Sequence, residues 1–328
     1  DPRLRHRPRA QSHPVVADFP PHLPPTLRTM ILSQVSFLTA QMALAHFSRH
    51  NSRLTRVEIT LRVTHKDNRY LEKYLQFVPG GFSINLLSLE HFSILELPDH
   101  ESTGDGTTVY PGALKLLRLI HLSPTIRTIR FSQYQPAYSE DKTNHFRIII
   151  PRFLSRTFTN LRTLDIGRYT EWIWHYEMIL EAAPESIEEL IMRDSYPTFV
   201  CPDGGYRHEG VLRMLCWPAQ RQVVSEEDTT TLPSTTTKVG YLPRLTHLKI
   251  YTISLWDWDP DLLVELVSSR IETCEVEGPS KRFRYLQLSY DNKTRAAGPS
   301  KDLLDRLKDI PGLDFLIDAV EQGDEKMG

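Results

Sequence analysis

The chain repeats a short pattern of apolar and polar positions, apolar-x-x-apolar-x-apolar, along most of its length. The clearest copies are 26–32 (TLRTMIL), 125–131 (TIRTIRF) and 160–166 (NLRTLDI). A second spelling occurs at 53–59 and 244–250. The last four positions of each copy alternate with a period of two, as a half-buried β-strand does. We therefore expect strands that begin at 27, 54, 84, 126, 161, 187, 245 and 283.

Two assignments stay open in this pattern. Phe92, Leu95 and Leu97 fit the same triplet and compete with the copy that begins at 84. Ile271, Cys274 and Val276 also fit it, and they are compatible with a further strand or with a loop. In the copy at 161, we expect Leu161, Leu164 and Ile166 to be buried, with Thr163 and Asp165 exposed, because a strand alternates between two faces.

Stretches with helical spacing separate most of the expected strands. In 171–183, Ile173, Tyr176 and Leu180 form one apolar stripe, and Pro184 ends the helix. The segment 301–317 also reads as helical, with an acidic outer side that suits a terminal cap. The other expected helices are 37–50, 68–78, 111–122, 144–158 and 260–269.

Alternating strands and helices at short intervals predict a repeat architecture. The shortest steps between strand starts, 26 and 27 residues, match leucine-rich repeats, whose period is about 20–29 residues. One strand–helix unit cannot bury its apolar side chains alone, so neighbouring units must stack. We expect an α/β leucine-rich-repeat solenoid, a horseshoe with parallel strands on the concave face, helices on the convex face and irregular repeat lengths.

The same pattern divides the chain into three parts. Residues 1–22 are rich in Pro and Arg and are expected to be a basic disordered arm. Residues 23–290 form the repeat domain, and its longest step contains an insertion, 195–242. The tract 225–238 (SEEDTTTLPSTTTK) has no apolar period and is expected to be a mobile loop. Residues 291–328 are expected to form a helical cap with an acidic tail.

Composition and charge narrow the class of protein. The 328 residues include 39 Lys and Arg against 41 Asp and Glu, and a net charge of −2 disfavours a dedicated nucleic-acid binder. No run of about 18 apolar residues predicts a membrane span. Three cysteines without a C-x-x-C pair fit a reducing compartment, the cytoplasm or the nucleus. A chain that begins at Asp1 rather than Met is expected to be a fragment or a processed form.

Three segments carry a resemblance to a known family. They are 23–37 (LPPTLRTMILSQVSF), 242–251 (LPRLTHLKIY) with the following 261–270 (DLLVELVSSR), and 302–317 (DLLDRLKDIPGLDFLI). Together they resemble the leucine-rich-repeat region of fungal F-box proteins. In that family the F-box docks on the adaptor of a cullin-type ubiquitin ligase and the repeats hold a substrate. The resemblance therefore implies a substrate-recognition role.

Residues 23–54 admit two interpretations. Their opening Leu-Pro, an Ile-Leu pair and a closing Ser-Arg resemble an F-box, which would bind a ubiquitin ligase adaptor. Thr26 stands where that motif has an acidic residue, and Asn51 where it has a tryptophan. Residues 27–32 also match the copies at 126 and 161. The segment is thus a first repeat or a degenerate F-box.

Candidate chemistry is sparse. Cys201, His208 and Cys216 are separated by six and seven residues and lack both a close pair and a fourth ligand, so we expect no zinc site. The chain contains no phosphate-binding glycine loop and no nucleophile elbow, and we expect no cofactor. One enzymatic alternative remains: Asp165 and Glu189 could act as paired carboxylates under a lid formed by 195–242.

Recognition of another protein is the function that this pattern favours. Residues between the apolar strand positions face the concave surface, and Arg, Tyr and Trp are enriched there, as they are at binding hot spots. Mixed charge with aromatic edges suits a protein ligand, so we expect a non-catalytic scaffold; a structural interaction module unrelated to ubiquitin ligation is the other alternative. The candidate binding residues are Arg56, Glu58, Arg130, Asp165, Arg168, Tyr169, Glu189, Arg193, His247, Lys249, Tyr251 and Trp256.

Overall fold

A computed structural model describes the repeat region and leaves several connecting segments aside. The described residues are 26–50, 53–62, 84–97, 112–132, 150, 152–155, 158–167, 173–193, 207–216, 241–252, 259–277, 283–291 and 298–320. The predicted arm 1–22, helix 68–78 and mobile tract 225–238 lie outside these residues. Everything that follows concerns the described part of the chain.

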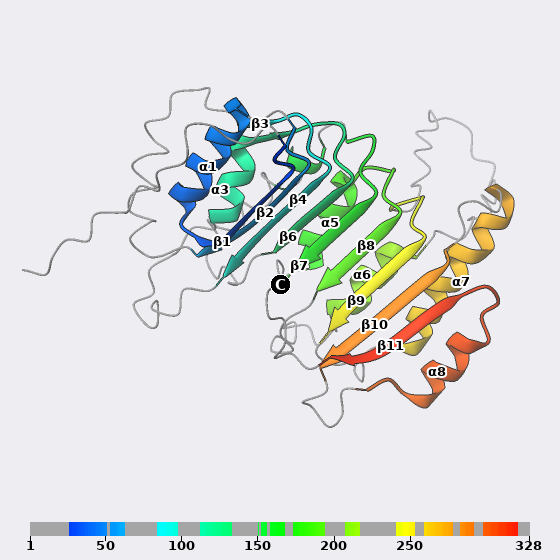
Figure 1. Cartoon of the computed structure of the whole chain (residues 1–328). Helices are drawn as coiled ribbons and strands as arrows, with labels where there is room; N and C mark the ends of the chain where they lie inside the picture. The colour runs from blue at the N-terminus through cyan, green and yellow to red at the C-terminus, as the bar shows by residue number, and fades with distance from the viewer. Residues whose placement is uncertain are drawn as a thin grey trace, which may run out of the picture.

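Nine strands form one parallel sheet and follow one another across it in chain order (Figure 1). β6 and β7 pair in parallel, as the repeat pattern predicts. The sheet has two free ends, at β1 and β11, and is therefore open rather than closed into a barrel. The strands are β1 (Thr29–Val35), β2 (Arg56–Arg62), β4 (His91–Leu97), β6 (Thr128–Ser132), β7 (Thr163–Gly167), β8 (Glu189–Arg193), β9 (His247–Thr252), β10 (Tyr285–Asp291) and β11 (Asp314–Val320).

Helices pack against this sheet, which makes the chain an α/β fold. In Figure 1, α5 and α6 lie behind the strands, with α1 and α3 near one end of the sheet and α7 and α8 near the other. Contacts join α1 to α3, α5 to α6, α6 to α7 and α7 to α8, and also α1 to β2 and α3 to β4. The helices are α1 (Phe37–His50), α3 (Gly112–Leu119), α5 (Ile173–Ala182), α6 (Arg207–Leu215), α7 (Pro260–Glu277) and α8 (Lys301–Lys308).

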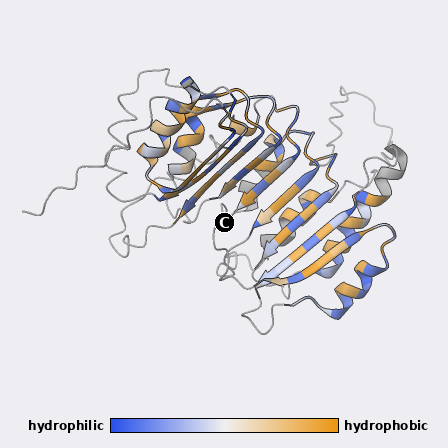
Figure 2. Ribbon diagram, viewed as in Figure 1, coloured by the Kyte–Doolittle hydropathy of each residue, from blue (hydrophilic) through white to orange (hydrophobic). Residues whose placement is uncertain are grey.

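Each strand divides its side chains between two faces of the sheet. Leu161, just before β7, and Leu164 and Ile166 on β7 are fully buried, as predicted from the triplet. Figure 2 shows the same alternation of hydrophobic and hydrophilic positions along the strands. We call the face that carries Arg56, Arg130 and Lys249 the polar face. The opposite face is apolar and packs against the helices.

A ladder of backbone hydrogen bonds aligns the starts of the strands from β2 to β10 in the main sheet. The carbonyl of Arg28 accepts from the N–H groups of Thr55 and Arg56, at 2.8 and 3.0 Å. The carbonyl of Arg127 accepts in the same way from Arg162 and Thr163, at 2.9 and 3.0 Å. Equivalent pairs of N–H groups donate to one carbonyl at the starts of β4, β6, β8, β9 and β10, whereas β11 begins with a single bond, from Asp314 to Arg284. The amino ends of these strands are therefore joined in the same way from one unit to the next.

The region around 84 differs from the prediction. Ile84–Leu86 forms a short strand, β3, which pairs with β5 (Ile120–Leu122) in a separate two-stranded sheet. The third strand of the main sheet is β4, and its buried triplet is Leu89, Phe92 and Ile94. Both candidate frames were thus wrong, because Leu89 ends one triplet and begins another. With this correction, units begin at 54, 89, 126 and 161, at even steps of 35, 37 and 35 residues.

Two further elements correct the sequence-based reading. Residues 271–276 continue helix α7 and form neither a strand nor a loop. The segment 301–317 is helical only to Lys308; Gly312 then adopts a positive φ of 78°, and β11 follows. Asp314 pairs with Tyr285 of β10, so this end of the chain adds a ninth strand to the sheet.

Candidate functional site

The register of the strands brings most of the candidate binding residues onto the polar face. Arg130 lies opposite Asp165, and Glu189 lies opposite His247. Arg193 lies opposite Tyr251. Arg56, Glu58 and Lys249 occupy equivalent alternating positions on β2 and β9. The candidates Arg168, Tyr169 and Trp256 lie outside the described residues.

Asp165 is the centre of this face and corrects a prediction. Alternation places its side chain on the polar face, yet the residue is only 5% exposed. Arg193 donates two hydrogen bonds to it, from Nε to Oδ1 at 3.0 Å and from Nη2 to Oδ2 at 3.2 Å. Arg130 Nε approaches Oδ2 at 3.3 Å from the other side. Two arginine side chains thus cover the carboxylate, which a single-strand pattern could not reveal.

Arg193 is held in place by a second contact. Its guanidinium carbon lies 4.4 Å from the centre of the Tyr251 ring on β9. A guanidinium over an aromatic ring is attracted by the negative face of the ring. The planar guanidinium of Arg193 is fixed by both the Asp165 carboxylate and the Tyr251 ring, so it loses little further conformational freedom when a partner binds.

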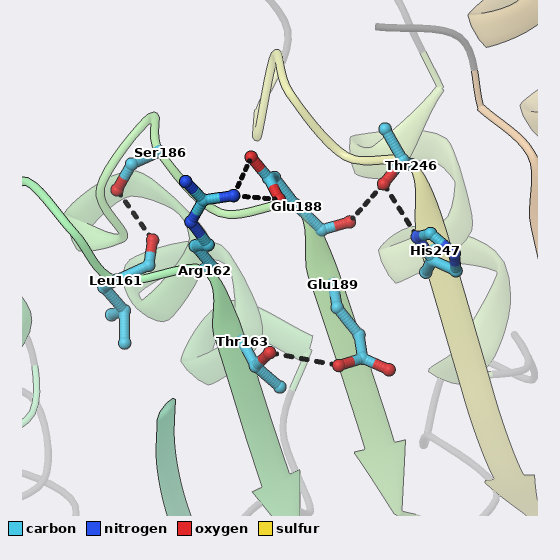
Figure 3. Close-up of polar contacts among 8 residues, drawn as sticks. All are labelled: Leu161, Arg162, Thr163, Ser186, Glu188, Glu189, Thr246 and His247. Atoms are coloured by element: carbon cyan, nitrogen blue, oxygen red, sulfur yellow. Dashed lines mark hydrogen bonds and ion pairs between the residues drawn. The ribbon is translucent and has the colours of Figure 1, made fainter. Parts of the chain in front are cut away.

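A second polar cluster surrounds Glu189 on β8. Lys249 Nζ lies 2.6 Å from Glu189 Oε1. Thr163 Oγ1 donates to Glu189 Oε2 at 3.0 Å (Figure 3). The hydrogen bond to Glu189 raises the pKa of Lys249 above its ordinary value. Three neighbouring strands are therefore joined by one carboxylate.

Polar contacts continue at the amino ends of these strands. Arg162 Nη1 donates to both carboxylate oxygens of Glu188, at 3.2 and 3.1 Å (Figure 3). Thr246 Oγ1 lies 2.8 Å from His247 Nδ1 and donates to the carbonyl of Glu188 at 3.0 Å. The ring of His247 lies 5.8 Å from that of Tyr285 on β10. An aromatic pair thus borders the charged cluster.

Arg56 and Glu58 stand apart from the central cluster. Arg56 Nε donates to Glu58 Oε1 at 2.6 Å on the same strand. The guanidinium and carboxylate therefore form a local ion pair on β2. A partner that contacts this pair meets a neutral unit rather than an isolated charge.

The two carboxylates of the enzymatic alternative are each bound to cations. Asp165 and Glu189 lie on adjacent strands but two register positions apart, opposite Ile191 and Thr163 respectively. Asp165 accepts from Arg193 and contacts Arg130, while Glu189 contacts Lys249. Both carboxylates thus hold side chains of neighbouring strands in place on the polar face.

Of the three metal candidates, only Cys216 has a described side chain. Cys216 follows α6 and is partly buried, and burial raises its pKa to about 11. Its thiol therefore stays protonated near neutral pH. Cys201 lies outside the described residues, and within them no group of three or more His, Cys, Asp or Glu could hold a metal ion. None of the described helices is long and apolar enough to cross a membrane.

Two buried charged residues escaped the sequence reading. Glu96 on β4 points to the apolar face, where its carboxylate accepts from the N–H groups of Gly112 and Ala113 at the start of α3, at 3.3 and 3.1 Å. Arg270 in α7 is 3% exposed and donates to three carbonyls. These are Leu215 at 2.6 Å, Tyr241 at 2.7 Å and Leu242 at 3.0 Å. In the correct frame, Glu96 follows Phe92 and Ile94 with a period of two, and this spacing could have predicted that its side chain is buried.

Comparison with known proteins adds no relative. No family model matches the chain, and no curated protein matches its sequence.

Proposed function

We propose that this chain is a non-catalytic, protein-binding scaffold of the leucine-rich-repeat type. On this proposal it is the substrate-recognition region of an F-box-type ubiquitin ligase receptor. The polar face receives the substrate, and the helices face away from it. Such a protein works in the cytoplasm or the nucleus.

The repeat architecture is supported by agreement between sequence and backbone. Triplets such as Leu54, Val57 and Ile59 recur in the successive units from β2 to β10 of the main sheet and are buried in each. The double-acceptor carbonyls recur at the same place in each unit. Stacking of equivalent units in chain order is what a solenoid requires.

The observation that carries the binding role is the organised polar face. Arg130, Arg193 and Tyr251 gather on three strands within one network of ion pairs and ring contacts. Arg and Tyr are among the residues most enriched at binding hot spots, and rigid anchors bind with less loss of entropy. Mixed charge rather than a uniform basic surface favours a protein partner over a nucleic acid.

The F-box part of the proposal rests on the resemblance of 23–54 and of the repeats. Residues 29–35 form the first strand of the sheet and pair with β2. That pairing favours the first-repeat interpretation of this segment. On that interpretation, residues 23–54 do not themselves bind the ligase adaptor.

Affinity purification from the native cell tests this proposal. The wild-type chain is compared with Arg130→Ala combined with Tyr251→Ala on the polar face. The control pair is Arg213→Ala with Lys308→Ala, which lie exposed on helices α6 and α8. We expect the polar-face pair to weaken partner recovery about thirtyfold, corresponding to about 2 kcal/mol, and the helix pair to leave it unchanged.

The identity of the recovered proteins separates the two parts of the proposal. Ligase adaptor subunits together with a polar-face-dependent partner support the complete role. A polar-face-dependent partner without adaptor supports a scaffold outside ubiquitin ligation. Equal losses for both variant pairs would place the binding surface elsewhere.

A further inference from the structure

Arg130 differs from the other cations near the centre of the polar face. Arg193 makes two hydrogen bonds to Asp165, and Lys249 makes a close ion pair with Glu189. Arg130 reaches Asp165 only as an ion pair, at 3.3 Å, and its Nε makes no hydrogen bond. Its side chain remains 37% exposed. Because Nε itself is buried, the donors that a partner can reach are the Nη groups, and the described contacts do not use them.

Asp165, the carboxylate next to Arg130, already has hydrogen-bond donors of its own. Both oxygens of Asp165 accept hydrogen bonds from Arg193. Two guanidinium groups thus share one carboxylate, and one positive charge is left without a matching anion in this pairing. A guanidinium forms its strongest contacts with a carboxylate or a phosphate, because two of its parallel N–H groups can donate to two oxygens of the same anion.

The neighbours of Arg130 suit a small anionic group. Ser93 lies directly opposite it on β4, and Thr128 precedes it by two residues on the same strand. Both residues are half-buried and carry hydroxyl groups on the polar face. Leu95, also half-buried on this face, lies opposite Ser132 in the next row. The surroundings offer hydroxyl donors and one apolar surface.

We infer that Arg130 anchors a single carboxylate of the protein partner, presented by an Asp or Glu side chain that contacts the polar face between β4 and β7. This inference rests on the proposed function and specifies the chemistry of its partner. One carboxylate balances the one excess charge. A phosphate carries a charge of about −1.5 to −2, which exceeds this single excess charge.

The test uses defined peptides rather than cell extract. Random peptides displayed on phage are selected on the immobilised full chain, and the best binder is synthesised with a fluorescent label. Each of its acidic residues is changed in turn to the matching amide. A phosphoserine version is made at the most sensitive position. Binding of each peptide is then measured by fluorescence anisotropy with the wild type, Arg130→Gln, Arg130→Lys and Arg56→Gln.

We expect one acidic position of the peptide to be coupled to Arg130. Changing it to the amide should weaken binding about tenfold with the wild type and hardly at all with Arg130→Gln. Arg130→Lys should retain part of the effect, because it keeps the charge without the paired donors. Arg56→Gln is the matched control: this arginine lies on the same face but already donates to Glu58, and the tenfold effect should persist.

Several outcomes would overturn the inference. These are selected peptides without a coupled acidic position, equal coupling in Arg56→Gln and Arg130→Gln, tighter binding of the phosphoserine peptide, or no selected binder at all. Melting temperatures of the variants identify any that fail to fold, and Arg130→Lys then provides the comparison. If cellular partner recovery still depends on the polar face, the scaffold role survives and only the acidic anchor is wrong.

Discussion

Asp165 and Arg270 illustrate how individual charged residues are buried in this protein. Asp165 lies on the polar face and is covered by two arginines from flanking strands. Arg270 lies between helices and satisfies three backbone carbonyls. Such groups are costly to bury unless hydrogen-bonded, so each constrains its surroundings strongly. Their partners lie 28 to 55 residues away in the chain, which is why local patterns did not reveal them.

Replacing Arg270 should be strongly destabilising. We expect Arg270→Met to lower the free energy of unfolding by about 3 kcal/mol or more, because three carbonyls lose their donor in a buried site. Arg270→Lys should recover only part of this loss, since one ammonium cannot reproduce the fork. Urea denaturation measures both. Arg213→Met, at an exposed position on α6, is the control and should have little effect.

Glu96 should make stability depend on pH. Burial raises its pKa from 4.5 to about 7, against the opposing effect of two backbone N–H donors. The folded state therefore holds a proton that the unfolded state releases between these values. The contribution of Glu96 to stability is complete below about pH 4.5 and is lost as the pH rises through 7.

The matched variant isolates this effect. Glu96→Gln keeps the shape and one acceptor but cannot titrate. The wild type should lose about 3 kcal/mol relative to Glu96→Gln between pH 4.5 and 7.5, as measured by urea denaturation at several pH values. A constant difference between the two proteins across this range would mean that Glu96 does not change its protonation on unfolding.

At the scale of strands and helices, the sequence predicted the repeated units well and their exact frames less well. The strands around 57, 129, 164, 190, 248 and 286, helix 37–50 and the parallel pairing are confirmed. The frame at 84 was wrong because a triplet of apolar residues fits several registers in an apolar segment. Leu87, which the chosen frame placed in the core, is 67% exposed.

β11 was missed for a different reason. The leucines from 303 to 316 continue a helical spacing, so periodicity alone extended α8 too far. Pro311 and Gly312 form a dipeptide that marks a turn, and Gly312 indeed takes a left-handed conformation. That signal predicted a break in the helix, and giving it more weight would have revealed the strand.

We expect a larger side chain at Gly167 to be tolerated only if Ser132 becomes smaller at the same time. They lie opposite each other on β6 and β7, and a Cβ at Gly167 would lie 2.6 Å from Ser132 Oγ and 2.7 Å from its Cβ. We expect Gly167→Ala to reduce stability by about 1–3 kcal/mol through this overlap. Adding Ser132→Gly removes both atoms and should restore most of the loss. Thermal unfolding of the single and double variants measures the coupling; purely additive effects would contradict it.

At the scale of the whole molecule, the sequence predicted the position of the polar face but not the contacts within it. The described binding candidates were expected on one face because the side chains of a strand alternate between two faces. The burial of Asp165 could not be predicted, because it depends on the register of three strands together. Likewise, the composition of 195–242 predicted an insertion. It did not predict that Arg270 holds the chain on both sides of residues 217–240, at Leu215 before them and at Leu242 after them.

Deleting 225–238 should therefore leave the fold intact. Its two flanks stay anchored to Arg270, and the tract has no apolar period that could form a packed element. Shortening a connection changes the cost of closing it only slightly. We expect the melting temperature to change by no more than a few degrees. A larger drop would show that the tract contributes packed side chains, and deletion of 207–216, which removes buried residues of α6, provides the contrasting case.

The backbone hydrogen bonds that align successive strands affect which changes in chain length the fold can tolerate during evolution. From β2 to β10, each strand of the main sheet is aligned at its amino end by the preceding unit, through the same pair of hydrogen bonds, whether the next unit begins 26 or 58 residues later. Insertions and deletions after a strand can therefore accumulate in one lineage without shifting the alignment of the units that follow. Duplication or loss of a complete unit likewise leaves a carbonyl in place to receive the next one. The number of residues in this protein can thus change during evolution while the alignment of its polar face is preserved.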